Sequence, residues 1–312
     1  MVCWLDANKG LVIAIDKSES PASFVTTKMA KQLFLHNIRI NGVKAVIYSY
    51  GLSDSRYAEY AGAVGFLSRE TGKAETVLEI GCGHSILPTF WQRLGIEVIV
   101  LDTSRMALRW QKIKGNKIAE RAVEAVLADM QYLPFRHESI MRLSCISALE
   151  HVPSNGDIGS ASEIGRVLKV NGISVISVPL TTRNEGCCIR HWGGEIPPLI
   201  QSLLHFCLPV VFRALRVDRT SSYFERLFSL EDVCKRIVIS SKCKEEDYFV
   251  LKSGSVAKAL HEKILPQGSL TVLEYLVARF LQIGKGITAP GAIIIELKKH
   301  RHGEIRQVPE NR

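Results

Sequence analysis

The segment Val77–Ser85 reads Val-Leu-Glu-Ile-Gly-Cys-Gly-His-Ser, and it decides the fold. Its first half is an apolar strand, its second half is a glycine-rich turn, and an apolar helix is predicted to follow over residues 86–94. A strand, a turn and a helix in this order form the nucleotide-binding unit of an α/β sheet. Gly81 and Gly83 allow the backbone to approach a ligand closely, because glycine has no Cβ. The acidic Glu79 would repel a pyrophosphate but suits a ligand that carries positive charge.

Units of one strand and one helix repeat from this segment to about residue 180. Strands are predicted at 96–101, 125–128, 140–147 and 173–178, and helices at 104–114 and 158–168. Such repeats form a mostly parallel sheet with helices on both faces. Two later strands, near 248–251 and 292–297, are expected to add an antiparallel hairpin. The predicted fold class is therefore α/β, a Rossmann-like seven-stranded mostly parallel sheet.

The remaining segments divide the chain into five expected parts. An N-terminal extension over residues 1–55 holds a short strand at Gly10–Ile15 and a predicted hairpin at Ile38–Ile47, where Asn41 and Gly42 suit a tight turn. The expected core spans 56–180, beginning with a helix near 56–71. An insertion on the acceptor side, a segment that completes the sheet and a basic tail are expected at 181–228, 229–298 and 299–312. Ser229 is placed to cap a helix.

Composition excludes several classes of protein. With 312 residues, of which 46% are hydrophobic, the chain can bury a full core. Its eight cysteines are scattered, which predicts buried free thiols and no metal site. The first residues lack the basic and apolar regions of a signal peptide, so we expect a cytoplasmic protein. The net charge of +9 permits contact with anionic partners, although a solvated basic tail also explains it.

Four acids are predicted at or just after the carboxyl ends of successive strands, the edge where ligands bind in open α/β sheets. They are Glu79, Asp102, Asp129 and Glu150. Gathered there, they would form a locally negative site that suits a sulfonium and an ammonium group. Asp102 follows Glu79 by 23 positions, the spacing expected for an acid that binds ribose hydroxyls. A dinucleotide is disfavoured, because Ile86 occupies the position where the dinucleotide motif requires a third small residue.

Five segments together resemble the class I S-adenosylmethionine-dependent methyltransferases, specifically the type 11 and quinone C-methyltransferase-like group. They are Val77–Ser85, Val98–Asp102, Ala128–Phe135, Leu149–Val152 and Glu163–Gly172. The resemblance departs from the family pattern at Ser85, where the family often has glycine, and at Val170-Asn171-Gly172, where it usually has Pro-Gly-Gly. Both replacements are compatible with a turn, since serine is small and asparagine tolerates a left-handed backbone.

The resemblance implies S-adenosylmethionine as cosubstrate and a role for each matching residue. Glu79, Gly81 and Gly83 would hold the methionine part, Asp102 the ribose, and Asp129 with Met130 the adenine. His151, after the fourth strand, is the candidate general base, because imidazole exchanges protons near neutral pH. The alternative is that His151 only caps a turn or supports Glu150.

The acceptor side is less defined. His191 and Trp192 fall in the insertion, where the family places acceptor-binding elements, although they could equally pack a lid. Residues 199–216 could form an interfacial helix that admits a lipid-like acceptor, or a lid helix packed on the sheet.

These observations favour a methyltransferase acting on a small molecule such as a quinone, a lipid-linked compound or a glycan precursor. The basic charge leaves an RNA methyltransferase as an alternative, but the Asn/Asp-Pro-Pro-aromatic motif of base-amine methylases is absent after the fourth strand, where Ser147–Glu150 stands. No RNA-binding module is recognisable, so nucleic acid is disfavoured as a partner. A third alternative is a non-catalytic regulatory protein that binds S-adenosylmethionine, although such a protein would not need the full set of acids and glycines.

Overall fold

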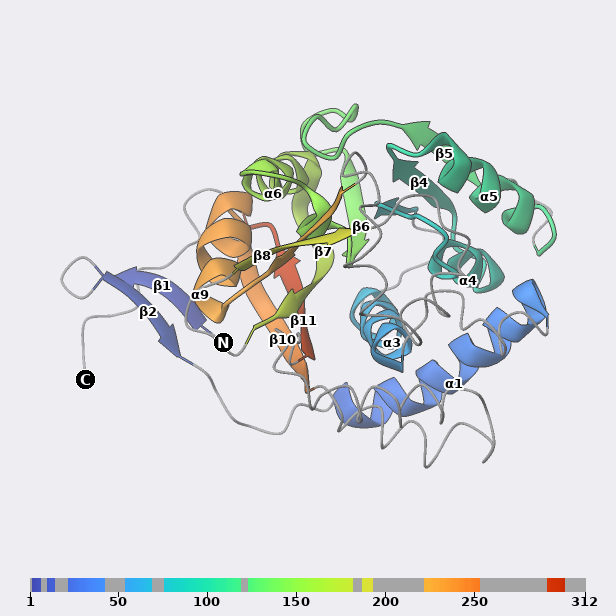
Figure 1. Ribbon diagram of the computed structural model, residues 1–312, viewed down its shortest axis with the longest axis horizontal. Coiled ribbons are helices and arrows are strands. Elements are labelled where there is room, and N and C mark those ends of the chain that lie inside the picture. Colours follow the sequence, from blue (N-terminus) through green and yellow to red (C-terminus); the bar gives the residue numbers. More distant parts are fainter. Residues whose placement is uncertain are drawn as a thin grey trace, which may run out of the picture.

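A seven-stranded sheet forms the centre of the molecule in the computed structural model (Figure 1). The structure describes residues 2–6, 10–14, 22–42, 54–68, 76–118, 123–181, 187–192, 222–252 and 291–300. The strand order is β10-β11-β7-β6-β3-β4-β5. The strands are β3 (Val77–Ile80), β4 (Val98–Asp102), β5 (Glu124–Leu127), β6 (Ile140–Ile146), β7 (Leu168–Leu180), β10 (Lys244–Lys252) and β11 (Gly291–Lys298).

The sheet is parallel from β5 to β7 and antiparallel at its other end. β3 pairs with β4 and with β6 in parallel, whereas β11 runs antiparallel to both β7 and β10. β7 follows α6 directly. Asn171, near the start of β7, has a left-handed φ of 63°. The predicted fold class, including the antiparallel last hairpin, is therefore confirmed, and Asn171 has the left-handed backbone that asparagine tolerates.

Helices cover both faces of the sheet, which explains why its central strands are mostly apolar. The helices are α1 (Ala22–Asn41), α3 (Asp54–Ser68), α4 (Leu87–Arg93), α5 (Arg105–Gly115), η2 (Leu149–His151), α6 (Gly156–Val167), α9 (Leu230–Asp232) and η3 (Val233–Ile239). Alternate side chains of one strand enter different cores. Val77 packs with Phe66 of α3 and Trp91 of α4, whereas Leu78 packs in the core that includes Ile164 of α6. Both cores are fully buried, so β3 is fixed at the centre of the molecule.

The N-terminal extension differs from the predicted arrangement. The strand expected at Gly10–Ile15 is present as β2 (Gly10–Ala14), which pairs with β1 (Val2–Asp6). The hairpin predicted at Ile38–Ile47 is wrong, because residues 38–41 are the last turn of α1. Gly42 ends this helix with a φ of 61°, and its amide donates to the Ile38 carbonyl over 2.7 Å. The Asn-Gly pair therefore terminates a helix, a second use of the same left-handed preference.

The C-terminal segment completes the sheet as expected. Ser229 caps α9 through a reciprocal pair with Asp232, so its predicted capping role is confirmed. Lys299, assigned to the basic tail, is held by α6 and β7, since its Nζ donates to the Gly165 carbonyl over 2.9 Å and its amide donates to the Gly172 carbonyl over 3.1 Å. The helices predicted at 199–208 and 269–282, and the tail beyond residue 300, lie outside the described residues. Among the helices that the structure describes, none has the length and apolarity to span a bilayer.

Candidate cofactor site

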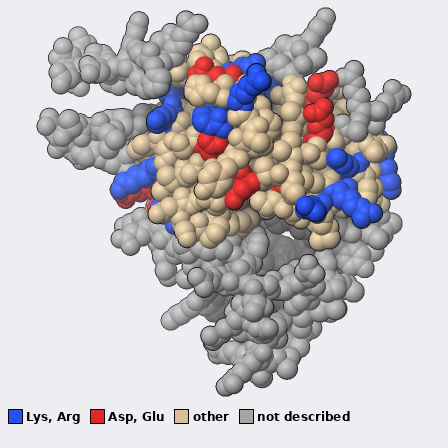
Figure 2. Space-filling model, turned by 90° about the horizontal axis from the view of Figure 1, so that it is seen from above, with Lys and Arg blue, Asp and Glu red and all other residues tan. Residues whose placement is uncertain are grey.

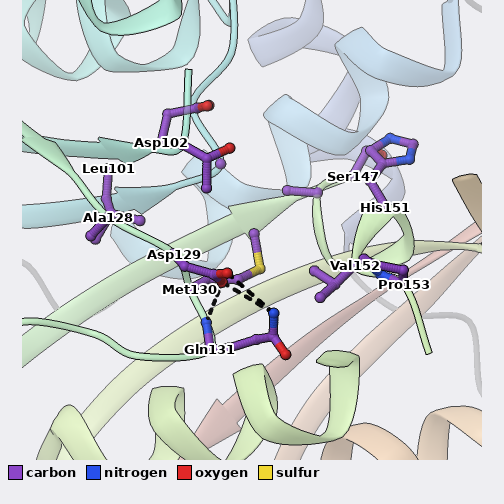
Figure 3. A pocket seen from close by; sticks show the side chains of 13 residues that line it. Leu101, Asp102, Ala128, Asp129, Met130, Gln131, Ser147, His151, Val152 and Pro153 are labelled. Atoms are coloured by element: carbon purple, nitrogen blue, oxygen red, sulfur yellow. Dashed lines mark hydrogen bonds between the residues drawn. The ribbon is translucent and has the colours of Figure 1, made fainter. Parts of the chain in front are cut away.

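A cavity of about 290 Å³ opens at the carboxyl ends of the parallel strands. Its lining comes from the turn after β3, from the end of β4, and from the segments that follow β4, β5 and β6 (Figure 3). The structure brings five of the predicted site residues to this cavity: Gly81, Asp102, Asp129, Met130 and His151. These residues are spread over 71 positions of the chain. The strand order alone therefore assembles a ligand-sized site where open α/β sheets bind ligands.

The turn after β3 depends on glycine at position 81. Gly81 has a φ of 66°, and a Cβ placed there would lie 2.4 Å from the Cβ of Ala148. Its amide donates to the Leu101 carbonyl over 2.8 Å, which ties the turn to β4. Any larger residue would be strained and would collide with the neighbouring loop. The close packing of the turn against Ala148 closes one wall of the cavity.

Gln111 of α5 fixes the rest of this turn, and sequence reasoning missed it. Its Nε2 lies 3.4, 3.1 and 2.9 Å from the carbonyl oxygens of Cys82, Gly83 and Ser85. The side chain is buried on the face of α5 that also buries Ala107, Leu108 and Gly115. A lone amide on an otherwise apolar helix face was the available signal, because a buried polar group needs hydrogen-bond partners.

Asp102 ends β4 and uses both carboxylate oxygens to hold backbone. Oδ2 accepts a hydrogen bond from the Gly83 amide over 2.8 Å, and Oδ1 accepts one from the Ser104 amide over 2.7 Å. These bonds connect the glycine turn to the start of α5, so the carboxylate is held in one position at the cavity wall. A carboxylate held this way by backbone amides is available, through its remaining lone pairs, to accept hydrogen bonds from ligand hydroxyls.

Asp129 and Met130 form the opposite part of the lining. The Asp129 Oδ1 accepts a hydrogen bond from the Gln131 amide over 2.8 Å, and the Gln131 side-chain Nε2 lies 3.2 Å from Oδ2 (Figure 3). Met130 places its thioether in the middle of the view, between the Asp129 and Ser147 sides. The site thus combines a fixed carboxylate and a polarisable apolar side chain, a pairing suited to the polar edge and the flat face of a base.

Two of the four predicted acids are not part of the cavity lining. Glu79 is 2% exposed and forms a hydrogen bond with the Ser144 hydroxyl, and burial raises its pKa to about 8. Glu150 is 3% exposed, and burial likewise raises its pKa to about 8. Both carboxyls are therefore mostly protonated at neutral pH. The negative charge predicted for this edge comes from Asp102 and Asp129, because desolvation disfavours the charged form of the other two.

Gly83 lies beside the cavity and contributes through its amide, which donates to Asp102. It is not one of the residues that line the cavity. The predicted contacts of Glu79 and Gly83 with a methionine group therefore stay predictions.

His151 ends the short helix η2 and lines the cavity. Its Nε2 lies 3.8 Å from Oε1 of Glu150, and its backbone amide donates to the Ala148 carbonyl over 3.1 Å. The Oε2 atom of Glu150 is buried without a hydrogen-bond partner among the described residues. The position is compatible with proton transfer at the cavity, and also with the alternative of support for Glu150.

Ser147 and Glu59 form a second polar group at this end of the cavity, and Glu59 was not predicted. Ser147 has a left-handed φ of 47° and lines the cavity, and its hydroxyl donates to Oε2 of Glu59 over 2.6 Å. The same oxygen accepts from the Ser177 hydroxyl over 2.9 Å and from Arg56 over 3.2 Å. α3 therefore fixes the loop after β6, a contact between residues 88 positions apart that no local pattern indicates.

Other predicted features have simpler outcomes. His191 and Trp192 lie in β8 (Cys187–Trp192), which pairs with β9 (Ser222–Leu227). Their contact with an acceptor stays a prediction.

Cys82, Cys145, Cys234 and Cys243 are buried free thiols, as expected. Within the described part of the chain, no group of His, Cys, Asp and Glu side chains could hold a metal ion.

Comparison with known proteins agrees with this site. Residues 78–176 match the family model described as a methyltransferase domain, a range that contains every predicted cofactor residue. No curated protein sequence matches the chain. The [4+2]-cyclase SpnF has a similar structure, with a TM-score of 0.51, 14% identity, and coverage of 92% of this chain and 98% of that one.

Two further solved structures are similar at lower scores. A SAM-dependent methyltransferase from Methanosarcina mazei is 12% identical, covering 75% of this chain and 96% of its own, with a TM-score of 0.45. The geranyl diphosphate C-methyltransferase of Streptomyces coelicolor is 15% identical, covering 78% and 79%, with a TM-score of 0.47. The match over residues 78–176 supports a methyltransferase domain in this chain, with S-adenosylmethionine as its cosubstrate.

Proposed function

We propose that this protein is an S-adenosylmethionine-dependent methyltransferase that acts on a small-molecule acceptor. The observation that carries the proposal is the single cavity that gathers Gly81, Asp102, Asp129 and Met130 inside the matched methyltransferase domain. In this assignment Asp102 accepts hydrogen bonds from the ribose, Asp129 and Met130 flank the adenine, and the turn at Gly81 holds the methionine part. Glu79 and Gly83 would complete the methionine side of the site, where the Gly83 amide donates to Asp102.

The chain's contribution to the reaction is chiefly alignment. Bound S-adenosylmethionine supplies an electrophilic methyl group, which an acceptor atom displaces in line from the sulfonium. Holding two reactants in that geometry is worth on the order of 7–11 kcal/mol. In this proposal the donor occupies the β4 and β5 side of the cavity. The acceptor then binds on the β6 side, next to Ser147 and His151. There His151 takes the proton that an oxygen or carbon acceptor releases, and Ser147 fixes the loop through Glu59.

The finer assignments extend this proposal. A quinone, a lipid-linked compound or a glycan precursor would fit an acceptor that needs a proton removed, and the insertion at 181–228 with His191 and Trp192 would complete its pocket. The quinone C-methyltransferase-like subgroup and a cytoplasmic location belong to the same proposal. The core at 56–180 would bind the donor and residues 229–298 would complete the sheet.

The reaction itself must be measured, because fold does not decide chemistry. The similar structure of a [4+2]-cyclase illustrates this point. We expect the protein, incubated with methyl-labelled S-adenosylmethionine and fractionated cell extract, to transfer label to a small-molecule fraction. Asp129→Ala should reduce transfer strongly, whereas Glu124→Ala, at an exposed acid at the start of β5, the strand that leads to Asp129, should not. Label that appears only in RNA would favour the alternative RNA methyltransferase, and binding without any transfer would favour a regulatory role.

A further inference from the structure

Three helices, α1, α4 and α5, form one continuous layer on the right-hand side of Figure 1. α1 contacts α4 through His36, whose Nε2 lies 3.1 Å from the Thr89 hydroxyl. α5 contacts α1 through Lys114, whose Nζ donates to the Ile40 carbonyl over 3.2 Å. We call the exposed side chains of these three neighbouring helices the α5 face.

The α5 face is strongly one-sided in charge. The sequences of α1, α4 and α5 contain no aspartate or glutamate. Exposed basic side chains are present on all three helices: Arg39, Arg93, Arg105, Arg109 and Lys112. The last three follow one another at intervals of four and three residues, so they share one side of α5. Figure 2 shows Lys and Arg side chains gathered on the right-hand side, where Figure 1 places α5.

The same face also exposes large aliphatic side chains. Leu35 is 54% exposed, Leu94 48%, Met106 64% and Ile113 48%. These are four of the seven large hydrophobic side chains that are exposed among the described residues. Met106 and Ile113 are seven positions apart, about two helical turns, and so lie on the same side of α5 beside the basic row. A concentration of exposed apolar groups marks an interaction site more often than scattered ones do.

We propose that the α5 face binds the surface of a membrane that contains anionic lipids. Basic side chains attract the lipid headgroups, and exposed aliphatic side chains enter the boundary with the acyl chains, the combination found in interfacial helices. Single-stranded RNA would instead favour aromatic side chains for stacking. Trp110, the aromatic residue of α5, already packs against other side chains. Its ring centroid lies 5.5 Å from that of His84 and 5.6 Å from the Lys114 Nζ.

The α5 face lies close to the cavity. Thr103 lines the cavity, and α5 begins at Arg105. A membrane held against α5 would therefore lie close to the β4 side of the cavity. This surface differs from residues 199–216, for which membrane contact was considered from the sequence.

The test is sedimentation of the full chain with vesicles of phosphatidylcholine alone and with vesicles that contain about one-third phosphatidylserine. We expect binding to the anionic vesicles only, weakening as salt is added. The triple variant R105Q/R109Q/K112Q should bind at least tenfold more weakly, since each basic residue near an anionic surface contributes about fivefold. A matched triple variant at exposed basic residues elsewhere, R136Q/K169Q/K242Q, removes the same charge and should bind like the wild type.

A second variant separates the apolar contribution. M106S/I113S should weaken vesicle binding severalfold while leaving its salt dependence unchanged, because no charge is removed. Equal vesicle binding by the two triple variants would overturn the proposal. Failure of the wild-type protein to bind anionic vesicles would also overturn it. Retention of single-stranded RNA through Arg105, Arg109 and Lys112, without vesicle binding, would overturn it in favour of a nucleic-acid surface. S-adenosylhomocysteine binding, measured in parallel, reports separately on the donor site and on folding.

Discussion

We call the β4 and β5 side of the cavity the donor side and the β6 side the acceptor side, after the roles proposed above, and the two sides are built in different ways. On the donor side, backbone amides of the turns after β3 and β4 hold Asp102 through bonds between residues at most 19 positions apart, and the Gln111 side chain adds bonds to the same turn. On the acceptor side, buried side chains meet from distant elements, as when Glu59 of α3 accepts hydrogen bonds from Ser147 and Ser177. The donor side is therefore a rigid backbone structure, whereas the acceptor side depends on a buried polar network that a single substitution can disrupt.

The largest effect is expected from Gly81→Ala, which would break the donor side. The new Cβ would lie 2.4 Å from Ala148 in a backbone with φ of 66°, so clash and strain act together. We expect a loss of about 2–4 kcal/mol of stability and no measurable S-adenosylhomocysteine binding by calorimetry. Gly95→Ala is the matched control, because Gly95 has a φ of 80° but open space around it. It should cost about 1–2 kcal/mol and keep binding.

Glu59→Gln tests the acceptor side alone. The substitution removes the charge that holds Ser147 and Ser177 but keeps an acceptor oxygen and nearly the same volume. We expect methyl transfer to fall about tenfold, because the loop carrying His151 loses a charge-assisted bond worth about 1.5–3 kcal/mol. Affinity for S-adenosylhomocysteine should stay within about twofold of wild type. A loss of both methyl transfer and S-adenosylhomocysteine affinity would show that the donor side and the acceptor side depend on each other.

Gln111→Met should weaken the donor side moderately. The variant keeps the volume of the side chain but removes the Nε2 that bonds three carbonyl oxygens of the glycine turn. Stability should fall by about 1–3 kcal/mol and S-adenosylhomocysteine affinity by about tenfold, as measured by urea unfolding and calorimetry. The neighbouring exposed Lys112→Met is the control and should leave both unchanged. Unchanged affinity in Gln111→Met would mean that the turn keeps its shape without this side chain.

The buried carboxyls of Glu79 and Glu150 make the stability of the protein depend on pH. Glu79 and Glu150 each have a pKa raised from 4.5 to about 8 by burial, so the folded protein binds more protons than the unfolded chain between these values. Stability should therefore be highest below about pH 4.5 with respect to these groups and decline as the pH rises toward 8. Glu79→Gln should remove part of this decline in urea midpoints measured from pH 5 to 8.5. An identical slope in the variant would show that Glu79 is already ionised in the folded protein.

Local patterns predicted the donor side because its chemistry is local. Gly81 and Asp102 follow strands whose apolar residues are visible in the sequence, and β3 and β4 are adjacent in both sequence and space. The prediction of four acids at the cavity was half right. Asp102 and Asp129 line it, whereas Glu79 and Glu150 are buried elsewhere, and burial depends on packing by distant parts of the chain. Asn41-Gly42 was assigned to a hairpin because the pair suits both turns and helix ends. Gln111 and Glu59 were missed because their partners come from other elements.

The central claim is that the cavity binds S-adenosylmethionine through Asp102 and Asp129. Calorimetric titration of the full chain with S-adenosylhomocysteine tests it most directly, with Asp129→Ala compared against Glu124→Ala. We predict saturable binding at one site per chain, strongly weakened by Asp129→Ala and unchanged by Glu124→Ala. No binding to the wild type, or equal binding by both variants, would contradict the assignment of this cavity as the donor site.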